Sequence, residues 1–407
     1  AVIVYYLLLL LMPFWQYPRL PRIGETLTVI KLVGLLVVIL ALVKWLFGER
    51  QTHLFRFTEI RLFFVLLVIA GASAVAITPG GLLSPSMQTF FSLAAYLFAT
   101  LVFVDTPRRL ETSCYVIVSS MVLASYSVYS GFVRYGARPG GIVGDSNYFA
   151  LIAVATLPLT YFLLPAAAPA KRLLLAGSGI FIVGAVLLSG SRGGLVSLGF
   201  CVLYSLLRTR KRLLFSFTAA AVLAGLLAFL PQTGLDRILA QDTGTVAATQ
   251  ARIESSKAGW EMLKSSPLTG VGLGMFKPTF AWMNDEMGWA TIAHNSYIEV
   301  AAELGVPALI LFLLILWSSW RRARRTSRFL ELAGDLAGGK VAVAIEIGIA
   351  GYAVGALFLS AEYSRQLWVL VALGAALGRL AMEHEWPQDA AAAVSDDESV
   401  DAGTVTT

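Results

Sequence analysis

Long uncharged apolar runs recur along the chain and predict membrane-spanning helices. Residues 27–46 contain a single lysine, and residues 309–317 contain no charge at all. A run of about 20 apolar residues is long enough to cross roughly 30 Å of hydrocarbon as a helix. The pattern predicts about twelve spans, at 2–15, 26–47, 61–78, 86–104, 110–130, 146–165, 172–189, 193–207, 213–230, 296–319, 341–360 and 365–382. We therefore expect an all-α polytopic membrane protein.

Four regions follow from this pattern. Residues 1–230 hold nine spans, and 296–382 hold the last three. Between them, 231–295 form a long loop with a helix-like stretch at 251–264 and a glycine-rich turn, so we expect this loop to be folded. The segment 383–407 is acidic, and its Ala/Asp/Ser/Thr-rich end has no aromatic residue, which predicts a disordered tail. The first run lacks a basic n-region and a small-residue cleavage site, so we expect a span and not a cleaved signal peptide.

Composition supports the membrane assignment and excludes other classes. Hydrophobic residues make up 57% of the 407-residue chain and charged residues 14%, whereas soluble domains carry about 25% charge. A water-soluble enzyme, a disulfide scaffold and a nucleic-acid binder are therefore excluded. The two cysteines, Cys114 and Cys201, lie in apolar runs and are expected to be small core residues.

The distribution of lysine and arginine predicts the topology. The loops after even-numbered spans hold 18 basic residues, or 19 with Arg379, and the opposite side holds 12. The positive-inside rule then places the even loops and both termini in the cytoplasm and the long loop in the periplasm. The formal net charge of +6 conceals a larger value, because seven acidic residues lie in the last 25 positions. The rest of the chain carries +13, which suits anionic lipids, phosphates or diphosphates.

Basic residues on the predicted outer side are the candidates for binding an anion. Arg192 lies in the segment SGSRGG (189–194), between two spans that are joined by almost no loop. The small neighbours allow close backbone approach, and the guanidinium fork matches a diphosphate. An arginine that snorkels to the interface is the alternative.

Arg252 and the glycine-rich turn are the features of the long loop. Arg252 is expected in the first turn of the 251–264 helix, where a cation is mildly unfavourable and a bound anion would explain it. A solvated position, or a pair with Glu254 or Asp242, is equally compatible. The turn PLTGVGLG (267–274) does not have dinucleotide-binding spacing, and its glycines are expected to bring the loop down onto the bundle.

His294 directly precedes a span and is the candidate general base. Ser296 and Glu299 have the spacing of a capping box, which predicts the helix start. A neutral imidazole accepts a proton near pH 7, and Glu299 and Glu303, on one helix face, are candidates to orient it or a substrate hydroxyl. A capping or packing histidine is the alternative. No cluster has metal-ligand spacing and no Walker A segment is present, so we expect metal-independent chemistry and no cofactor.

Three segments together resemble the O-antigen ligase and polymerase superfamily of bacterial inner membranes. They are SGSRGG, the stretch that runs from Arg252 through Trp260 to PLTGVGLG, and AHNSYIEVAAELG (293–305). The resemblance implies a fold of the GT-C type and transfer of a glycan from undecaprenyl diphosphate to an acceptor hydroxyl, inverting and on the periplasmic side. It implies functional roles for Arg192, Arg252 and His294. We also expect substrate contacts from a further set of residues: Arg134, Arg138, Asn295, Glu299, Glu303, Trp282 and Trp289.

The resemblance leaves the acceptor open. A ligase uses the core sugars of lipopolysaccharide, and a polymerase uses a second lipid-linked repeat unit. The motifs favour the ligase. The expected partners are the lipid-linked donor, a glycan acceptor and membrane lipids, with no nucleic acid. A transporter or flippase for an anionic lipid-linked substrate is the rival from another class, but the two halves of the chain show no matching motifs.

Overall fold

The computed structural model describes residues 1–14, 22–23, 27–48, 56–135, 140–164, 167–208, 243–284 and 291–383. The described α-helices are α1 (Val2–Leu11), α2 (Val29–Phe47), α3 (Thr58–Ala76), α4 (Pro85–Phe103), α5 (Pro107–Tyr135), α6 (Ser146–Phe162), α7 (Pro169–Leu188), α8 (Arg192–Arg208), α11 (Thr243–Ser265), α12 (Phe276–Met283), α13 (Ser296–Leu332), α14 (Leu336–Gly355) and α15 (Arg365–Glu383). Short 3-10 turns lie at Met12–Phe14, Gly81–Leu83 and Gly141–Val143, and a two-residue hairpin pairs β1 (Arg22–Ile23) with antiparallel β2 (Leu27–Thr28). The expected all-α membrane fold is confirmed.

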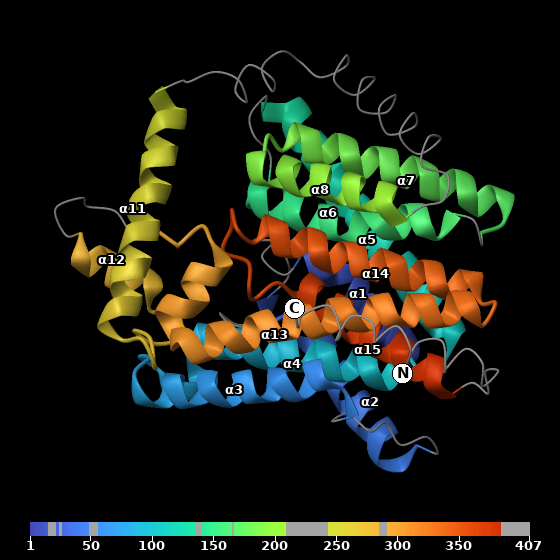
Figure 1. Cartoon of the computed structure of the whole chain (residues 1–407), viewed down its shortest axis with the longest axis horizontal. Coiled ribbons are helices and arrows are strands. Elements are labelled where there is room, and N and C mark those ends of the chain that lie inside the picture. Colours follow the sequence, from blue (N-terminus) through green and yellow to red (C-terminus); the bar gives the residue numbers. More distant parts are fainter. Residues whose placement is uncertain are drawn as a thin grey trace, which may run out of the picture.

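The helices form one bundle, and α13, α14 and α15 run through it (Figure 1). Helix α14 packs against α13, α6 and α8, while α15 packs against α4 and α13. Nearly every residue of α15 is buried, including Trp368. Helix α11 stands across one end of the bundle beside the start of α13, with α12 next to it (Figure 1). We call this end the site end.

Eight of the described helices are long and apolar enough to cross a membrane. They are α2, α3, α4, α5, α7, α13, α14 and α15. Two further apolar segments, Val2–Phe14 and Ser146–Phe162, are shorter, and α8 has 17 residues. These helices fall on eleven of the twelve predicted spans. The remaining one, 213–230, lies outside the described residues, as does the predicted tail from residue 384 onward.

Polar side chains at the opposite end of the bundle are joined in ion pairs. Lys44 Nζ lies 2.6 Å and Arg109 Nη1 2.5 Å from the carboxylate of Asp105. Arg322 pairs with buried Glu59, and Arg208 lies 3.1 Å from buried Glu346. This end carries the arginine cluster of α13, and we call it the basic end. The two cysteines are free and buried, as the sequence predicts.

Candidate functional site

The turn from α7 to α8 holds Arg192 at the site end. Ser191 Oγ accepts a hydrogen bond from Gly194 N–H (3.1 Å) and so caps α8. A Cβ atom on Gly193 would lie 2.7 Å from Phe358, and one on Gly194 would lie 2.5 Å from Ala150 of α6. The glycines are therefore required for close packing, as the sequence predicts. Arg192 is the first residue of α8 and its side chain is exposed.

Arg252 lies on α11 and is half-buried. The sequence predicts it in the first turn of a helix, and this prediction is wrong, because α11 begins at Thr243 and Arg252 lies in its third turn. The residues before 251 read as a loop because they are polar and small, yet several of them are good helix formers. Glu254, one of its possible partners, pairs instead with Lys257 (3.4 Å). Within the described ranges, no acidic side chain forms an ion pair with Arg252.

A small crevice brings Arg252 next to the α7–α8 turn. Its volume is about 10 Å³, no more than one water molecule occupies. The lining comprises Arg252, the neighbours of Arg192 in the turn, two residues of α6 and a segment after α14: Asn147, Leu151, Ser191, Gly193, Gly194, Arg252, Gly355, Phe358 and Leu359. Segments far apart in the sequence thus converge around Arg252.

His294 lies at the entry to α13, within electrostatic range of Arg252. Its backbone adopts φ +53°, and it is the one non-glycine residue with positive φ in the described part of the chain. Its Nε2 is 3.4 Å from Thr291 Oγ1, whereas its Nδ1 is buried without a hydrogen-bond partner among the described residues. Buried Ser255, one turn after Arg252, donates to the carbonyl oxygen of Ala293 (3.3 Å). Helix α11 therefore holds the residue before His294 in place.

The electrostatic surroundings of His294 favour its neutral form. Burial lowers the pKa of the imidazole first, and the positive charge of Arg252 lowers it further. Asp145, the N-cap of α6, acts in the opposite direction and raises this pKa. The net effect is a pKa below the ordinary value of a histidine. The imidazole is consequently unprotonated, and able to accept a proton, near neutral pH.

The start of α13 differs by one residue from the predicted capping box. Asn295 is the N-cap, and its Oδ1 accepts from Tyr297 N–H (2.9 Å) and Ile298 N–H (3.1 Å). Ser296 instead donates to Leu359 O (2.7 Å) and accepts from Ala361 N–H (2.8 Å), in the segment after α14. Asn and Ser cap almost equally well, so tertiary contacts decide which of them does. Asn295 therefore has a structural role here.

Glu299 and Glu303 lie on one face of α13, as predicted, and both are buried. Glu299 Oε2 accepts from Ala293 N–H (3.3 Å), so it supports the segment that carries His294. Glu303 points to the glycine-rich turn, where its two oxygens accept from Gly274 N–H (2.9 Å) and Phe276 N–H (3.1 Å). Tyr363 donates to the same carboxylate (2.8 Å).

The segment between α14 and α15 adds a buried carboxyl that the sequence analysis did not single out. Glu362 is 3% exposed, and its Oε2 has no hydrogen-bond partner among the described residues. Burial raises the pKa of Glu362 well above its ordinary value, and the nearby Glu299 raises it further. Both effects favour the neutral form of the Glu362 side chain. No local sequence signal distinguishes it, because its neighbours come from α13.

The other predicted site residues lie apart from this group or outside the described residues. Arg134 is exposed in the last turn of α5, and Trp282 of α12 is 81% exposed. Arg138 and Trp289 fall outside the described ranges. The structure adds Asp145, Asn147 and Ser255, which contact or influence His294 and Arg252. A polar residue at a predicted helix start was the one available signal for Asp145.

In the ranges that the structure describes, no group of three or more His, Cys, Asp or Glu residues is arranged to hold a metal ion. Metal-independent chemistry stays a prediction. The arrangement offers a cationic side chain and a neutral imidazole within electrostatic range of each other at one end of a membrane bundle. Such a pair is suited to binding an anionic group and removing a proton from a hydroxyl next to it.

Part of the chain is similar to a known protein family. Residues 177–313 match the family model of O-antigen ligases. The matched segment contains α8, α11, α12 and the first part of α13, and so includes Arg192, Arg252 and His294. A search of curated proteins found no significant match to the chain. The match supports the O-antigen ligase and polymerase superfamily, and its members are glycosyltransferase-like membrane enzymes that use a lipid-linked glycan and a glycan acceptor.

Proposed function

Because residues 177–313 match the O-antigen ligase family, we propose that this protein transfers a glycan from undecaprenyl diphosphate to an acceptor hydroxyl, as an O-antigen ligase does. The acceptor is the core oligosaccharide of lipopolysaccharide. The protein works in the bacterial inner membrane, with both termini in the cytoplasm and the site end in the periplasm. The excess of basic residues at the opposite end supports this orientation.

The position of Arg252 supports this proposal most directly. This arginine lies against the SGSRGG turn on one side and is close enough to His294 on the other to lower the pKa of the imidazole. No described acidic group neutralises it by an ion pair. A half-buried guanidinium without such a partner is a ready site for an anionic ligand.

Arg252 and Arg192 bind the diphosphate of the donor in this proposal. The crevice at Arg252 is too small to hold a diphosphate, so the phosphates lie at its outer side, toward the exposed Arg192. Bond cleavage leaves an additional negative charge on the diphosphate. Arginines already in position stabilise that charge without reorganisation, which lowers the barrier. The lipid chain lies along the apolar faces of the bundle.

His294 is the general base. The acceptor oxygen attacks the anomeric carbon and forms the new glycosidic bond, while the bond from that carbon to the diphosphate oxygen breaks with its electron pair. The hydroxyl proton goes to the neutral imidazole. A single displacement of this kind inverts the anomeric centre. The lowered pKa of His294 supports the role, because the imidazole is unprotonated before the reaction.

Substitutions at the three residues test this assignment. Arg192→Ala, Arg252→Ala and His294→Ala are each expected to reduce glycan transfer by at least about 100-fold, the scale on which a positioned base contributes. The measurement is transfer from lipid-linked donor to acceptor by purified protein in detergent.

The matched control is Lys257→Ala. Lys257 is exposed on the same helix as Arg252 and pairs only with Glu254 among the described residues. This variant should retain wild-type transfer. All variants should elute as folded protein and melt at similar temperatures. Wild-type transfer by Arg252→Ala and His294→Ala would refute the site.

A further inference from the structure

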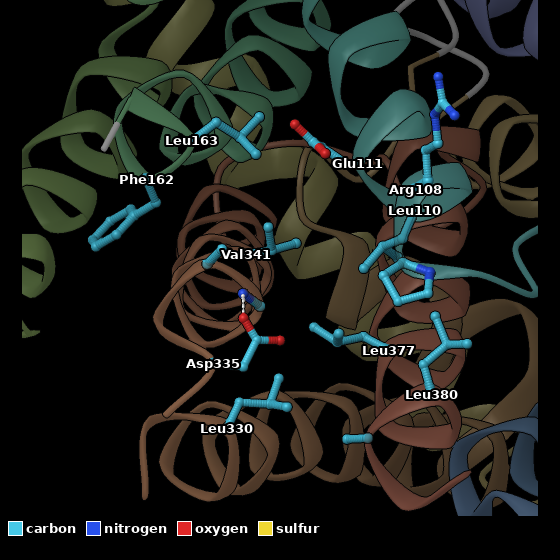
Figure 2. A pocket seen from close by; sticks show the side chains of 14 residues that line it. Arg108, Leu110, Glu111, Phe162, Leu163, Leu330, Asp335, Val341, Leu377 and Leu380 are labelled. Atoms are coloured by element: carbon cyan, nitrogen blue, oxygen red, sulfur yellow. Dashed lines mark hydrogen bonds between the residues drawn. The ribbon is translucent and has the colours of Figure 1, made fainter. Parts of the chain in front are cut away.

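A second cavity lies at the basic end of the bundle, opposite the proposed site. It measures about 400 Å³ and opens between the start of α5, the end of α6, the α13–α14 turn and the last turns of α15 (Figure 2). Its fourteen lining residues are Pro107, Arg108, Leu110, Glu111, Phe162, Leu163, Leu330, Asp335, Ala337, Gly338, Val341, Leu377, Leu380 and Ala381. We call it the acidic cavity.

Most of the lining is apolar. Ten of the fourteen residues are apolar, and the aliphatic side chains of Val341 and Leu377 lie at its centre (Figure 2). Every contributing helix begins or ends close to the cavity, so it lies where membrane-spanning helices leave the hydrocarbon layer. A cavity at this level meets both acyl chains and headgroups.

Two of the three charged residues that line the cavity are acidic, although the surrounding end of the bundle is basic. Glu111 and Asp335 place their carboxyl groups on either side of Val341, and Arg108 extends outward at the edge (Figure 2). Asp335 uses one oxygen to accept from Gly338 N–H (2.9 Å). Glu111 is exposed and has a hydrogen bond with Tyr115, and Asp335 is half-buried. Neither carboxylate forms an ion pair with any described cation. Elsewhere at the same end, Asp105, Glu59 and Glu346 all do.

Two carboxylates without ion pairs, lining one cavity at an end rich in arginine, indicate a cationic ligand. The apolar lining indicates that this ligand also carries hydrocarbon. A free polyamine would neutralise the carboxylates but would leave the apolar lining exposed to water. An anionic lipid would be repelled by the two carboxylates. A phospholipid whose headgroup joins a phosphate to a primary ammonium suits the two carboxylates, the apolar lining and the basic surroundings together.

We propose that the acidic cavity binds an aminophospholipid, of the phosphatidylethanolamine class. The ammonium lies between Glu111 and Asp335, where it makes charge-assisted hydrogen bonds. The phosphate turns outward toward Arg108. The acyl chains run along Phe162, Leu163, Leu377 and Leu380. Because the cavity joins α5, α6, α13, α14 and α15, a bound lipid stabilises the packing of these helices.

Thermal unfolding of the purified protein in detergent, with defined lipids added, tests the proposal. Phosphatidylethanolamine should raise the melting temperature in a saturable manner, since a ligand that binds only the folded state stabilises it. Phosphatidylglycerol and phosphatidylcholine should not, because the first lacks the ammonium and the second lacks its N–H donors. The double variant Glu111→Gln/Asp335→Asn should bind phosphatidylethanolamine at least about tenfold more weakly.

Two further variants make the test decisive. Asn keeps the cap of α14, so the double variant should melt like wild type without lipid. Glu331→Gln removes an exposed acid outside the cavity and should bind as wild type does. Ala337→Trp fills the cavity from an exposed position without changing its charge, and should abolish the lipid effect.

Equal stabilisation by phosphatidylglycerol, or undiminished binding by the double variant, would overturn the proposal. The same holds if ethanolamine or putrescine protects as well as the lipid, because the ligand would then be a free amine. Failure of this test leaves the proposed transferase site untouched, since the two sites lie at opposite ends and share no residue.

Discussion

The backbone of His294 adopts a left-handed conformation that costs a non-glycine residue roughly 1–2 kcal/mol. Contacts on both sides hold it there. Ser255 of α11 binds the carbonyl oxygen of Ala293, and Glu299 of α13 binds its N–H. Strain that is fixed by neighbours in this way is typical of functional positions. In this position the imidazole lies within electrostatic range of Arg252 and Asp145.

The opposing effects of Arg252 and Asp145 on His294 predict a shift in pH dependence. His294 must be neutral to accept a proton, so transfer falls as the pH drops through its pKa. Asp145 raises this pKa. Asp145→Asn keeps the cap of α6, whose acceptor is Oδ1, but removes the charge. The acidic limb of kcat/KM against pH should therefore move to lower pH.

The control for this shift is Glu254→Gln, which removes a negative charge from α11 that is not among the causes of the shifted pKa of His294. Its acidic limb should coincide with that of the wild type. An unchanged limb in Asp145→Asn, or a shift to higher pH, would show that His294 is not the group that titrates.

The glycine-rich turn forms hydrogen bonds with α13 at a break in this helix. Gly305 adopts φ +79° and Pro307 has no N–H, so the carbonyl groups of Ala302 and Glu303 lack their helical donors. Val271 N–H (2.8 Å) and Gly272 N–H (3.0 Å) donate to them, and Val306 N–H donates to Pro267 O (2.8 Å). The loop that precedes α13 and the helix itself thus complete each other's hydrogen bonds.

This interlock predicts a large stability cost at Gly270. The residue has φ +66°, and a Cβ atom there would lie 2.2 Å from the backbone carbon of Glu303. Gly270→Ala should lower the free energy of unfolding by roughly 2 kcal/mol. Gly177→Ala is the matched control. It lies in α7 with no neighbour within 4 Å, and the change should be neutral or slightly stabilising. Equal melting temperatures for the two variants would contradict the interlock.

Features that depend on local sequence could be predicted, and features that depend on contacts between distant segments could not. Hydropathy located the long helices, because membrane crossing depends on local composition. The start of α11 was missed, since Thr243–Ser265 is barely apolar and its first turns read as a loop. The cap of α13 was displaced from Ser296 to Asn295 by contacts with the segment after α14. Glu362 joins the site through tertiary packing, for which the chain has no local signal, and Asp145 is marked in the sequence only as a polar residue at a predicted helix start.

The two ends of the bundle differ in whether their charged side chains form ion pairs. Acids at the basic end pair with arginines and lysines, apart from the two in the acidic cavity and a few exposed ones. At the site end, Arg252 lies against a tight turn and a neutral histidine. This difference is consistent with the proposed orientation, in which the basic end meets the cytoplasmic headgroups.

The proposed reaction forms a glycosidic bond from a lipid-linked donor. The most direct measurement reconstitutes the purified chain in liposomes with a glycan on undecaprenyl diphosphate and offers two acceptors, lipopolysaccharide core and a second lipid-linked repeat unit. Mass analysis should find the glycan covalently attached to the core in the wild type and not in His294→Ala. Movement of the intact donor across the membrane, with no new covalent product on either acceptor, would contradict the account.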